Sequence, residues 1–419
     1  VNNAGRHRIT DYADSAARIE AAGRLDISAG RDIANQGGVF DSRGDLSLSA
    51  GRDVTLASVE QRISQARGTR YLDAQVTQLG AEVTAGGDMD IRAGGTLSAI
   101  ASQIEDRRDI TLAAGGDVLL AAAANEDHFY SKSKKVTRST DKIVQQSTTV
   151  QAGRDIAINA GQDLTLVASQ VKAGNNVALD AEQDINILSA KDESASFYFK
   201  KKKGSFGRSS SKQQENYDST NVASVIEAGN DLTVNASKAA DGGMSIDGGR
   251  DVIVIGSQLK AGSDLLVGGT GDVAVHTGVE EHGSYSKKTK SGFLGLSKSG
   301  KSQLKTKPSQ VGSELEAGND VVIAAGNDVR LRASETRASN DVELRAGLVT
   351  ATGDINLVSA DHEAYSRSEE YKKNVGLSFS DAVGLAVGTP GFGGDITLAS
   401  AKKAGKEAMS STSVGSQVV

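Results

Sequence analysis

Aspartate is the residue whose type and spacing most suggest chemistry in this chain. A phrase of Ala-Gly-x-Asp followed by alternating apolar residues recurs, as in 50–56 and 152–158. A calcium-binding β-roll needs a nine-residue period with paired aspartates, whereas each phrase here carries one Asp. We therefore interpret these aspartates as turn residues that hydrogen-bond the backbone just beyond them, and not as metal ligands. The aspartates so interpreted are Asp53, Asp155, Asp163, Asp184 and Asp320.

Histidine, the other residue type suited to metal binding or proton transfer, occurs at scattered positions. The five histidines are His7, His128, His276, His282 and His362, and none has metal-ligand spacing with another His or Cys. The sequence contains no phosphate-binding loop, no Gly-x-Ser-x-Gly elbow and no His-Glu-x-x-His. These patterns predict no catalytic residue, no metal and no cofactor. A polysaccharide-active enzyme with acids in a surface cleft is a weaker alternative.

Lysine and aromatic side chains are sorted into four segments, near 121–150, 189–226, 275–314 and 359–394. These segments hold 13 of the 16 aromatic residues and 19 of the 25 lysines, but only 3 of the 22 arginines. A fifth, weaker segment lies near 58–84. Random surface loops would not sort residues in this way, so we predict a contact surface. The alternative interpretation is that the segments are solubilising decorations, or protect strand edges from pairing.

The four segments share an outline of an aromatic residue, a lysine run, a Gly and a second aromatic residue. This outline predicts β-hairpins with polar, Gly-containing tips. Each segment follows an apolar run at an equivalent point of the repeat, so the hairpins should emerge in a row from one side. The residues predicted to contact a membrane or partner are Phe129, Tyr130, Lys132, Lys134, Lys135, Phe197, Tyr198, Phe199, Lys200, Lys201, Lys202, Lys203, Phe206, Tyr285, Lys287, Lys288, Phe293, Leu294, Tyr371, Lys372, Lys373 and Phe379.

A fixed period positions all of these residues. Successive phrases are 8 or 13 residues apart, which gives a repeat of 21 residues, as from Asp32 to Asp53 and from Asp251 to Asp272. Each repeat holds short apolar-x-apolar runs that suit strands, and one repeat cannot bury its apolar face alone. Stacked repeats can bury their apolar faces against one another. Residues 1–419 are therefore predicted to form one all-β solenoid, a parallel β-helix. Leucine-rich repeats need a Leu-x-x-Leu-x-Leu frame that is absent. The residues predicted to point inward are Val54, Leu56, Leu164, Leu166, Ile185, Ile187, Val321 and Ile323.

Composition limits the remaining possibilities. The net charge of −6 is too small to make nucleic acid the main partner, and no Cys is present to form a disulfide. No stretch approaches the roughly 20 apolar residues of a membrane-spanning helix. The sequence begins with Val1 and not with Met, so we expect it to be a piece of a longer protein.

The repeats and insertions together resemble a known family. The 21-residue Ala-Gly-x-Asp coils are similar to the haemagglutinin repeats of filamentous-haemagglutinin-type exoproteins of the two-partner secretion class. The insertions, notably 291–296, look most like the second repeat region of CdiA-type contact-dependent inhibition effectors. The resemblance implies a right-handed parallel β-helix on the surface of a Gram-negative bacterium, exported by an outer-membrane partner. It also implies a role in delivering a toxin across the target cell's outer membrane.

The favoured interpretation is a non-enzymatic stalk segment whose hairpins contact a target-cell envelope. Lysines would meet anionic lipid or lipopolysaccharide phosphates, and aromatic residues suit the membrane interface. The partner could equally be a surface receptor. A host-cell adhesin that binds sulfated glycan or protein is the second interpretation, and a surface polysaccharide-active enzyme is the third.

Overall fold

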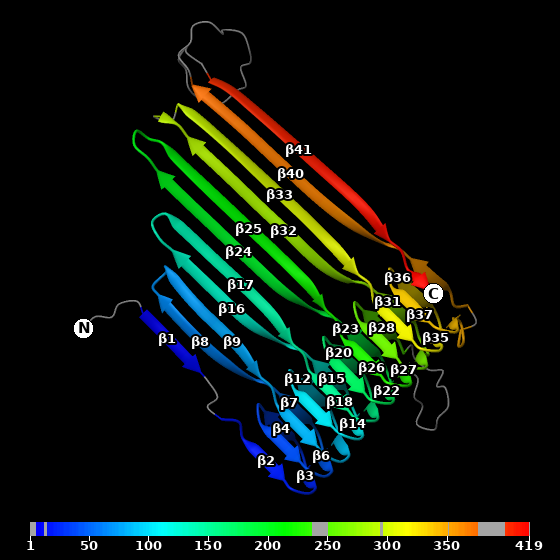
Figure 1. Ribbon diagram of the computed structural model, residues 1–419. Helices are drawn as coiled ribbons and strands as arrows, with labels where there is room; N and C mark the ends of the chain where they lie inside the picture. Colours follow the sequence, from blue (N-terminus) through cyan, green and yellow to red (C-terminus); the bar gives the residue numbers. More distant parts are fainter. Residues whose placement is uncertain are drawn as a thin grey trace.

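The computed structural model describes residues 6–11, 15–236, 250–293, 296–350, 352–375 and 399–418. Every extended regular element in these ranges is a β-strand. Three parallel sheets form the walls of a coiled rod, and a fourth, antiparallel sheet projects from one side of it (Figure 1). The predicted β-helix with protruding hairpins is therefore confirmed.

The three walls of the rod are sheets of 11, 10 and 10 parallel strands, each strand paired with its equivalents in adjacent coils. The first sheet contains β2 (Arg18–Ala21), β5 (Val39–Ser42), β10 (Glu82–Ala85), β13 (Gln103–Asp106), β18 (Thr149–Ala152), β21 (Gln170–Ala173), β26 (Val225–Ala228), β29 (Gln258–Ala261), β34 (Glu314–Ala317), β37 (Glu335–Ala338) and β42 (Gln417–Val418). The second contains β3 (Leu25–Ala29), β6 (Leu46–Ala50), β11 (Met89–Ala93), β14 (Ile110–Ala114), β19 (Ile156–Ala160), β22 (Val177–Ala181), β27 (Leu232–Ala236), β30 (Leu265–Gly269), β35 (Val321–Ala325) and β38 (Val342–Arg345). The third contains β4 (Ile33–Gln36), β7 (Val54–Ala57), β12 (Leu97–Ile100), β15 (Val118–Ala121), β20 (Leu164–Val167), β23 (Ile185–Leu188), β28 (Val252–Ile255), β31 (Val273–His276), β36 (Val329–Arg332) and β39 (Ile355–Val358).

One coil uses one strand from each wall, and the strand register explains the period. Ile156 pairs with Val177 in the next coil, which is 21 residues further along the chain. Alternate residues point inward, so each coil adds a layer of aliphatic side chains to one continuous core. All eight residues predicted to point inward are fully buried. Because each layer contacts only its neighbours, the rod is stabilised coil by coil.

The turn aspartates bond the backbone, but in the next coil and not just beyond their own turn. Asp53 Oδ1 accepts a hydrogen bond of 2.9 Å from the N–H of Thr96. Asp155 Oδ1 accepts one of 3.0 Å from the N–H of Asn176. The sequence expectation of a bond within the turn is therefore wrong. The carboxylates form ladders along two corners of the rod, because stacking places the same turn directly above each Asp.

The third corner, between the third and first sheets, alternates between two forms. In every second coil the chain turns directly through a residue with positive φ, as at Ala168 (46°) and Gly256 (55°). In the other coils a hairpin leaves the rod at this corner. A column of buried hydroxyls bonds the corners to one another; for example, the N–H of Ser224 donates to Ser257 Oγ at 3.3 Å. This column satisfies backbone groups that would otherwise be buried without partners.

The fourth sheet, called the hairpin sheet, has 11 antiparallel strands. It begins with a strand that precedes the first coil and continues through five hairpins. The last hairpin ends at Val414, beyond the predicted segment 359–394. The prediction stopped short because the returning arm lacks aromatic residues. The strands are β1 (Arg6–Asp11), β8 (Val59–Arg67), β9 (Tyr71–Leu79), β16 (Ala123–Lys132), β17 (Val136–Gln146), β24 (Ala190–Lys203), β25 (Ser209–Val222), β32 (Gly278–Ser291), β33 (Ser297–Val311), β40 (Ala360–Val375) and β41 (Ala399–Val414).

Candidate binding surface: the hairpin sheet

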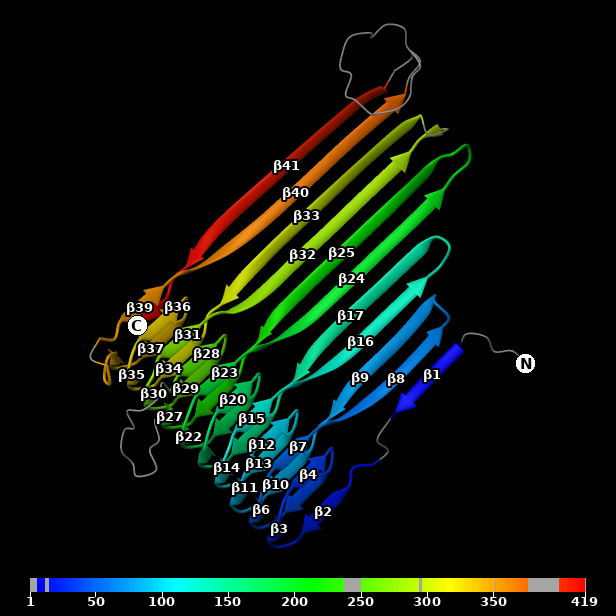
Figure 2. The ribbon, with the colours of Figure 1, turned by 180° about the vertical axis from the view of Figure 1, so that it is seen from behind.

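The five hairpins are not separate protrusions, because each pairs with the next along most of its length. Strand β9 pairs with β16, β17 with β24, β25 with β32, and β33 with β40. Figures 1 and 2 show the result as a broad blade beside the rod, with neither face covered by another described element. A predicted row of hairpins is thus a single continuous surface.

The strand register sorts the side chains of this sheet onto two faces. Residues paired directly across an antiparallel ladder point to the same side, and so do residues two apart in one strand. Phe197 pairs with Glu215, which pairs with Tyr285, which pairs with Leu304. We call the face that carries this row the aromatic face. Lys200 lies on the opposite side, which we call the lysine face.

The aromatic face carries most of the rings. Phe197, Tyr217, Tyr285 and Leu304 border a shallow pocket with a volume of about 480 Å³. The ring of Tyr371 covers the backbone of Gly300, where an added Cβ would lie only 2.3 Å from the ring. An aromatic residue paired across a glycine shields a stretch of strand that has no side chain of its own. The aromatic face therefore presents aromatic rings that are partly exposed to solvent.

The lysine face is dominated by amino groups. Lys200 pairs with Lys212, Lys212 with Lys288, and Lys288 with Lys301, which places four ammonium-bearing residues in one row across four strands. One ring lies among them: Tyr198 has the amino group of Lys212 at 5.8 Å and the guanidinium of Arg138 at 5.3 Å from its centroid. These are cation–π distances.

The residues predicted from the sequence to contact a partner fall into four places. The register puts on the aromatic face Tyr130, Lys132, Phe197, Phe199, Lys201, Lys203, Tyr285, Lys287, Tyr371 and Lys373. It puts on the lysine face Phe129, Tyr198, Lys200, Lys202, Lys288 and Lys372. The hairpin tips carry Lys134, Lys135, Phe206 and Phe293. Outside the described residues lie Leu294 and Phe379.

The tips of neighbouring hairpins also meet. The rings of Phe206 and Phe293 lie 5.5 Å apart between centroids, although 87 residues separate them in the chain. Phe206 has a positive φ of 56° and is 69% exposed. Two rings held together in solvent at the outer end of the blade are suited to contact with a partner.

Sequence reasoning missed a recurring histidine arrangement in the hairpin sheet. His128 Nδ1 lies 3.0 Å from Asp141 Oδ1, its direct cross-strand neighbour, and Nε2 lies 3.1 Å from Glu126 Oε2. Hydrogen bonds to the carboxylate of Asp141, and then to that of Glu126, raise the pKa of His128 above its usual value. His282 has a similar arrangement, with Asp218 of the neighbouring hairpin opposite it and Glu280 two residues before it, at 3.9 Å. The signal is the repeated Glu-x-His, but its Asp partner is apparent only from the strand register.

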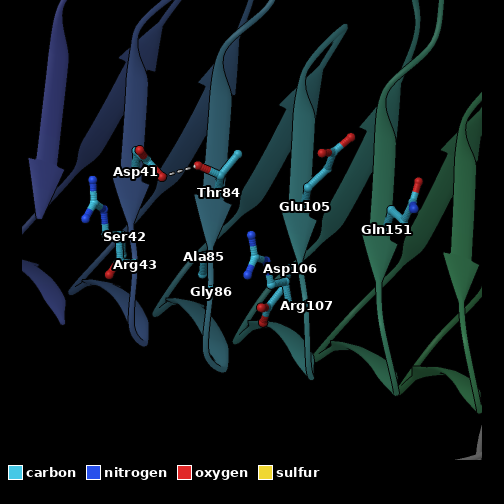
Figure 3. A pocket seen from close by; sticks show the side chains of 10 residues that line it. All are labelled: Asp41, Ser42, Arg43, Thr84, Ala85, Gly86, Glu105, Asp106, Arg107 and Gln151. Carbon is cyan, nitrogen blue, oxygen red and sulfur yellow. Dashed lines mark hydrogen bonds between the residues drawn. The ribbon is translucent and has the colours of Figure 1, made fainter. Parts of the chain in front are cut away.

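A further pocket lies on the outer surface of the first sheet of the rod (Figure 3). Its volume is about 500 Å³, and its polar groups include Asp41, Glu105 and Asp106. Asp41 accepts a hydrogen bond of 2.7 Å from the hydroxyl of Thr84, while Glu105 and Asp106 are adjacent in one strand and point to opposite faces. Glu105 and Asp106 therefore do not face one another, as the two carboxylates of a sugar hydrolase do. Among the described residues, no group of three or more His, Cys, Asp or Glu could hold a metal ion.

Comparison with known families decides the identity of the repeat. The model of the haemagglutinin repeat matches residues 3–75, 69–141, 130–205, 204–298 and 294–419. The chain belongs to the haemagglutinin-repeat family. Consecutive matches meet or overlap near the hairpin tips, so one family repeat runs from tip to tip and contains two coils. A haemagglutinin repeat is thus a structural unit of the filament.

Three curated relatives share this repeat region. The chain is 27% identical over 230 residues to the 16S rRNA endonuclease CdiA of Enterobacter cloacae, covering 48% of this chain and 7% of that protein. It is 28% identical over 280 residues to the tRNA nuclease CdiA of Escherichia coli strain STEC_O31, covering 61% and 8%. It is 36% identical over 168 residues to the deoxyribonuclease CdiA of Dickeya dadantii, covering 36% and 5%. The matches therefore span less than a tenth of each relative, and the nuclease activities in those names belong to those proteins.

No solved structure matches the haemagglutinin-repeat chain significantly. Within the described ranges, no helix is long and apolar enough to cross a membrane. The family and its relatives indicate a secreted, cell-surface filament of a Gram-negative bacterium, and they place this chain in a CdiA-type region.

Proposed function

We propose that this filament segment engages the outer membrane of a target cell during contact-dependent growth inhibition, and that the hairpin sheet makes the contact. The chain has no catalytic part in this proposal. Its partners are lipid, lipopolysaccharide or a surface receptor of the target envelope, together with the outer-membrane protein that exports the full-length effector. The aromatic and lysine side chains of the hairpins would touch the envelope.

The observation that carries the proposal is a sheet of 11 strands whose two faces are both open. An antiparallel sheet usually packs one face on a core. Here the rod already has its own core, and the hairpin sheet contributes side chains such as Tyr371, 41% exposed, and Met409, 74% exposed, to solvent. Exposed rings and apolar side chains on an open sheet face are candidates for contact with a partner.

The rod itself supplies the variant that tests this role. Deleting 189–222 joins Leu188 to the pair Ala223-Ser224, which reproduces the hairpin-free corner at Ala168-Ser169. Deleting 277–311 joins His276 to a Gly-Ser pair, as at Gly256-Ser257 in the natural corner. The double deletion should therefore keep the coils stacked while it removes four strands of the hairpin sheet.

The experiment compares the binding of the whole chain and of this deletion variant to outer-membrane vesicles, by co-sedimentation. We expect the deletion to abolish most of the binding while circular dichroism still shows β-structure. Equal binding by both chains would overturn the role of the hairpins. Binding to heparin but to no membrane vesicle would instead support a host-cell adhesin that recognises sulfated glycan.

A further inference from the structure

We infer that the lysine face of the hairpin sheet is a phosphate-binding surface, which lies against the phosphate layer of an anionic lipid membrane. The inference rests on the proposed function and adds to it the side of the sheet, the residues and the ligand chemistry. The aromatic and lysine side chains lie on opposite sides of the sheet, so a flat membrane surface can meet only one set at a time.

The lysines form a two-dimensional grid. One row consists of Lys200, Lys212, Lys288 and Lys301, each directly opposite the next. A second row, two residues nearer the tips, contains four lysines and two serines: Lys202, Ser210, Lys290, Ser299, Lys372 and Lys402. Neighbouring strands are about 4.8 Å apart and the two rows about 6.8 Å apart. The strand register is continuous over this area, and the first row ends at Glu370, which is directly opposite Lys301.

The two faces differ in charge. Over β24 to β41, the register assigns to the lysine face Lys200, Lys202, Lys212, Lys288, Lys290, Lys301, Lys305, Lys307, Lys372, Lys402 and Lys406, against Asp192, Asp218, Glu280 and Glu370. It assigns to the aromatic face Lys191, Lys201, Lys203, Lys287, Lys298, Arg367, Lys373 and Lys403, against Glu193, Glu215, Glu281, Asp361, Glu363, Glu369 and Glu407. Cations therefore clearly exceed carboxylates on the lysine face and nearly balance them on the aromatic face.

Few of the lysines in the grid have a compensating charge within the chain. In the part of the chain that the structure describes, one of these eleven lysines makes an ion pair, Lys372 with Glu370 at 3.8 Å. Two of the four face carboxylates, Asp218 and Glu280, are instead paired with His282. Like charges placed directly opposite one another destabilise a sheet. Bound anions would remove this repulsion, which is the physical reason for assigning a ligand to this face.

The shape of the grid favours a membrane over a linear polyanion. The lysines extend across six strands and along more than one row, whereas a single nucleic acid or glycan chain offers one line of charge. A lipid surface presents phosphates in two dimensions and attracts basic residues by about a factor of five in affinity for each lysine near the surface. The attraction is screened within about 10 Å at 0.1 M salt.

Lysines on the opposite face of β24, β32 and β33 provide a control of equal charge. The test variant is K200Q/K212Q/K288Q/K301Q, which neutralises the first row of the lysine face. The control variant is K201Q/K203Q/K287Q/K298Q, which removes the same charge from the aromatic face in the same part of the sheet. Binding of the 419-residue chain to phosphatidylcholine vesicles with and without phosphatidylglycerol is measured by co-sedimentation, with heparin and duplex DNA as alternative ligands.

We expect the row variant to lose binding to the anionic vesicles by roughly 600-fold at low salt, from a factor of about five for each of four lysines. The control variant should lose at most a small part of this. The row variant should also melt at a higher temperature than the unchanged chain in the absence of anions, since the repulsion is gone. This second measurement confirms that the variant is folded.

Three results would overturn the inference. Equal losses of binding in the two variants would show that vesicle binding depends on total charge and not on the face that carries it. The proposed membrane contact would still stand. If neither variant lost binding to the vesicles, the membrane contact would belong to other residues of the sheet. Binding of the unchanged chain to heparin or DNA, with no binding to any of these lipid vesicles, would overturn this inference; the proposed function would fall only if outer-membrane vesicles were not bound either.

Discussion

The carboxylate of Asp163 reaches one coil along the rod, where its Oδ1 accepts a hydrogen bond of 3.1 Å from the backbone N–H of Asp184. Asp184 does the same for Asp251 in the coil after it, at 2.9 Å. Each aspartate therefore holds two coils together at a turn where strand pairing has ended. Asn176 occupies the equivalent place in the other ladder, and its Oδ1 accepts from the N–H of Asp231 at 3.2 Å.

This relationship predicts that Asp163→Ala destabilises the rod by about 1–2 kcal/mol, because a backbone N–H loses its partner. Asp163→Asn should recover most of the loss, since an amide oxygen already serves this role at Asn176. Urea unfolding followed by circular dichroism measures both effects. Equal stability of the alanine variant and the unchanged chain would show that the ladder contributes little.

The turn aspartates are also predicted to act without a metal. Thermal unfolding of the chain should occur at the same temperature in excess calcium and in excess chelator, since the ladder oxygens are occupied by backbone donors such as the N–H of Asp341 on Asp320. Scanning calorimetry in the two buffers provides the comparison. A rise of many degrees with calcium would contradict the interpretation of these residues as turn-formers.

Leu166 is fully buried in the narrow core of the rod. Leu166→Asp would place an unpaired carboxylate among aliphatic side chains, and should destabilise the affected coils by more than about 4 kcal/mol. The control is Thr165→Asp, because Thr165 points outward from the same strand. Limited proteolysis should cut the first variant near this coil and spare the second.

Asp106 predicts a pH dependence of stability. It is buried at a position where the flanking coils carry Ala85 and Ala152, and its Oδ2 has no hydrogen-bond partner. Burial raises the pKa of Asp106 to about 6 from the model-peptide value of 3.8. The folded state therefore prefers the neutral acid, and stability should fall by about 3 kcal/mol as the pH rises from 3.8 through about 6.

Asp106→Asn should remove this fall, and should be more stable than the unchanged chain at neutral pH. Asp106→Ala should have the same two effects, because the flanking coils already carry alanine at the equivalent position. Chemical unfolding at a series of pH values tests the prediction. An unchanged pH slope in both variants would mean that the Asp106 carboxylate is solvated in the folded protein.

His128 predicts a second, smaller pH effect in the hairpin sheet. Its pKa is raised, chiefly by Asp141 and then by Glu126, so the folded state binds the proton more tightly than the unfolded state. The resulting stabilisation is fully present below the unfolded pKa of about 6.5 and is lost as the pH rises through the higher folded value. The melting temperature of His128→Gln should therefore differ from that of the unchanged chain more at about pH 5.5 than at about pH 9. The same difference at both values would contradict the prediction.

The amino-acid sequence by itself determined the rod. A recurring 21-residue period, with apolar residues at alternate positions such as Leu164 and Leu166, indicates stacked coils, because each repeat can bury its apolar face only against a copy of itself. The hairpins could also be predicted, since their content of aromatic residues and lysines differs from that of the coils. Turn chemistry identified the aspartates, although it predicted the wrong bond for them.

Only the tertiary structure decided what the hairpins become. The pairing of β17 with β24 and of β25 with β32 joins segments from different repeats, and it is set by the stacking of the coils that carry them. That pairing fixes which face each side chain occupies, because a shift of one residue would turn every side chain to the other side. Lys200 and Lys201 are neighbours in the chain and part of one lysine run, yet the register sends them to opposite faces of the sheet. The lysine run is visible in the sequence. Its division between the two faces of the sheet depends on pairing with strands that lie far away in the sequence.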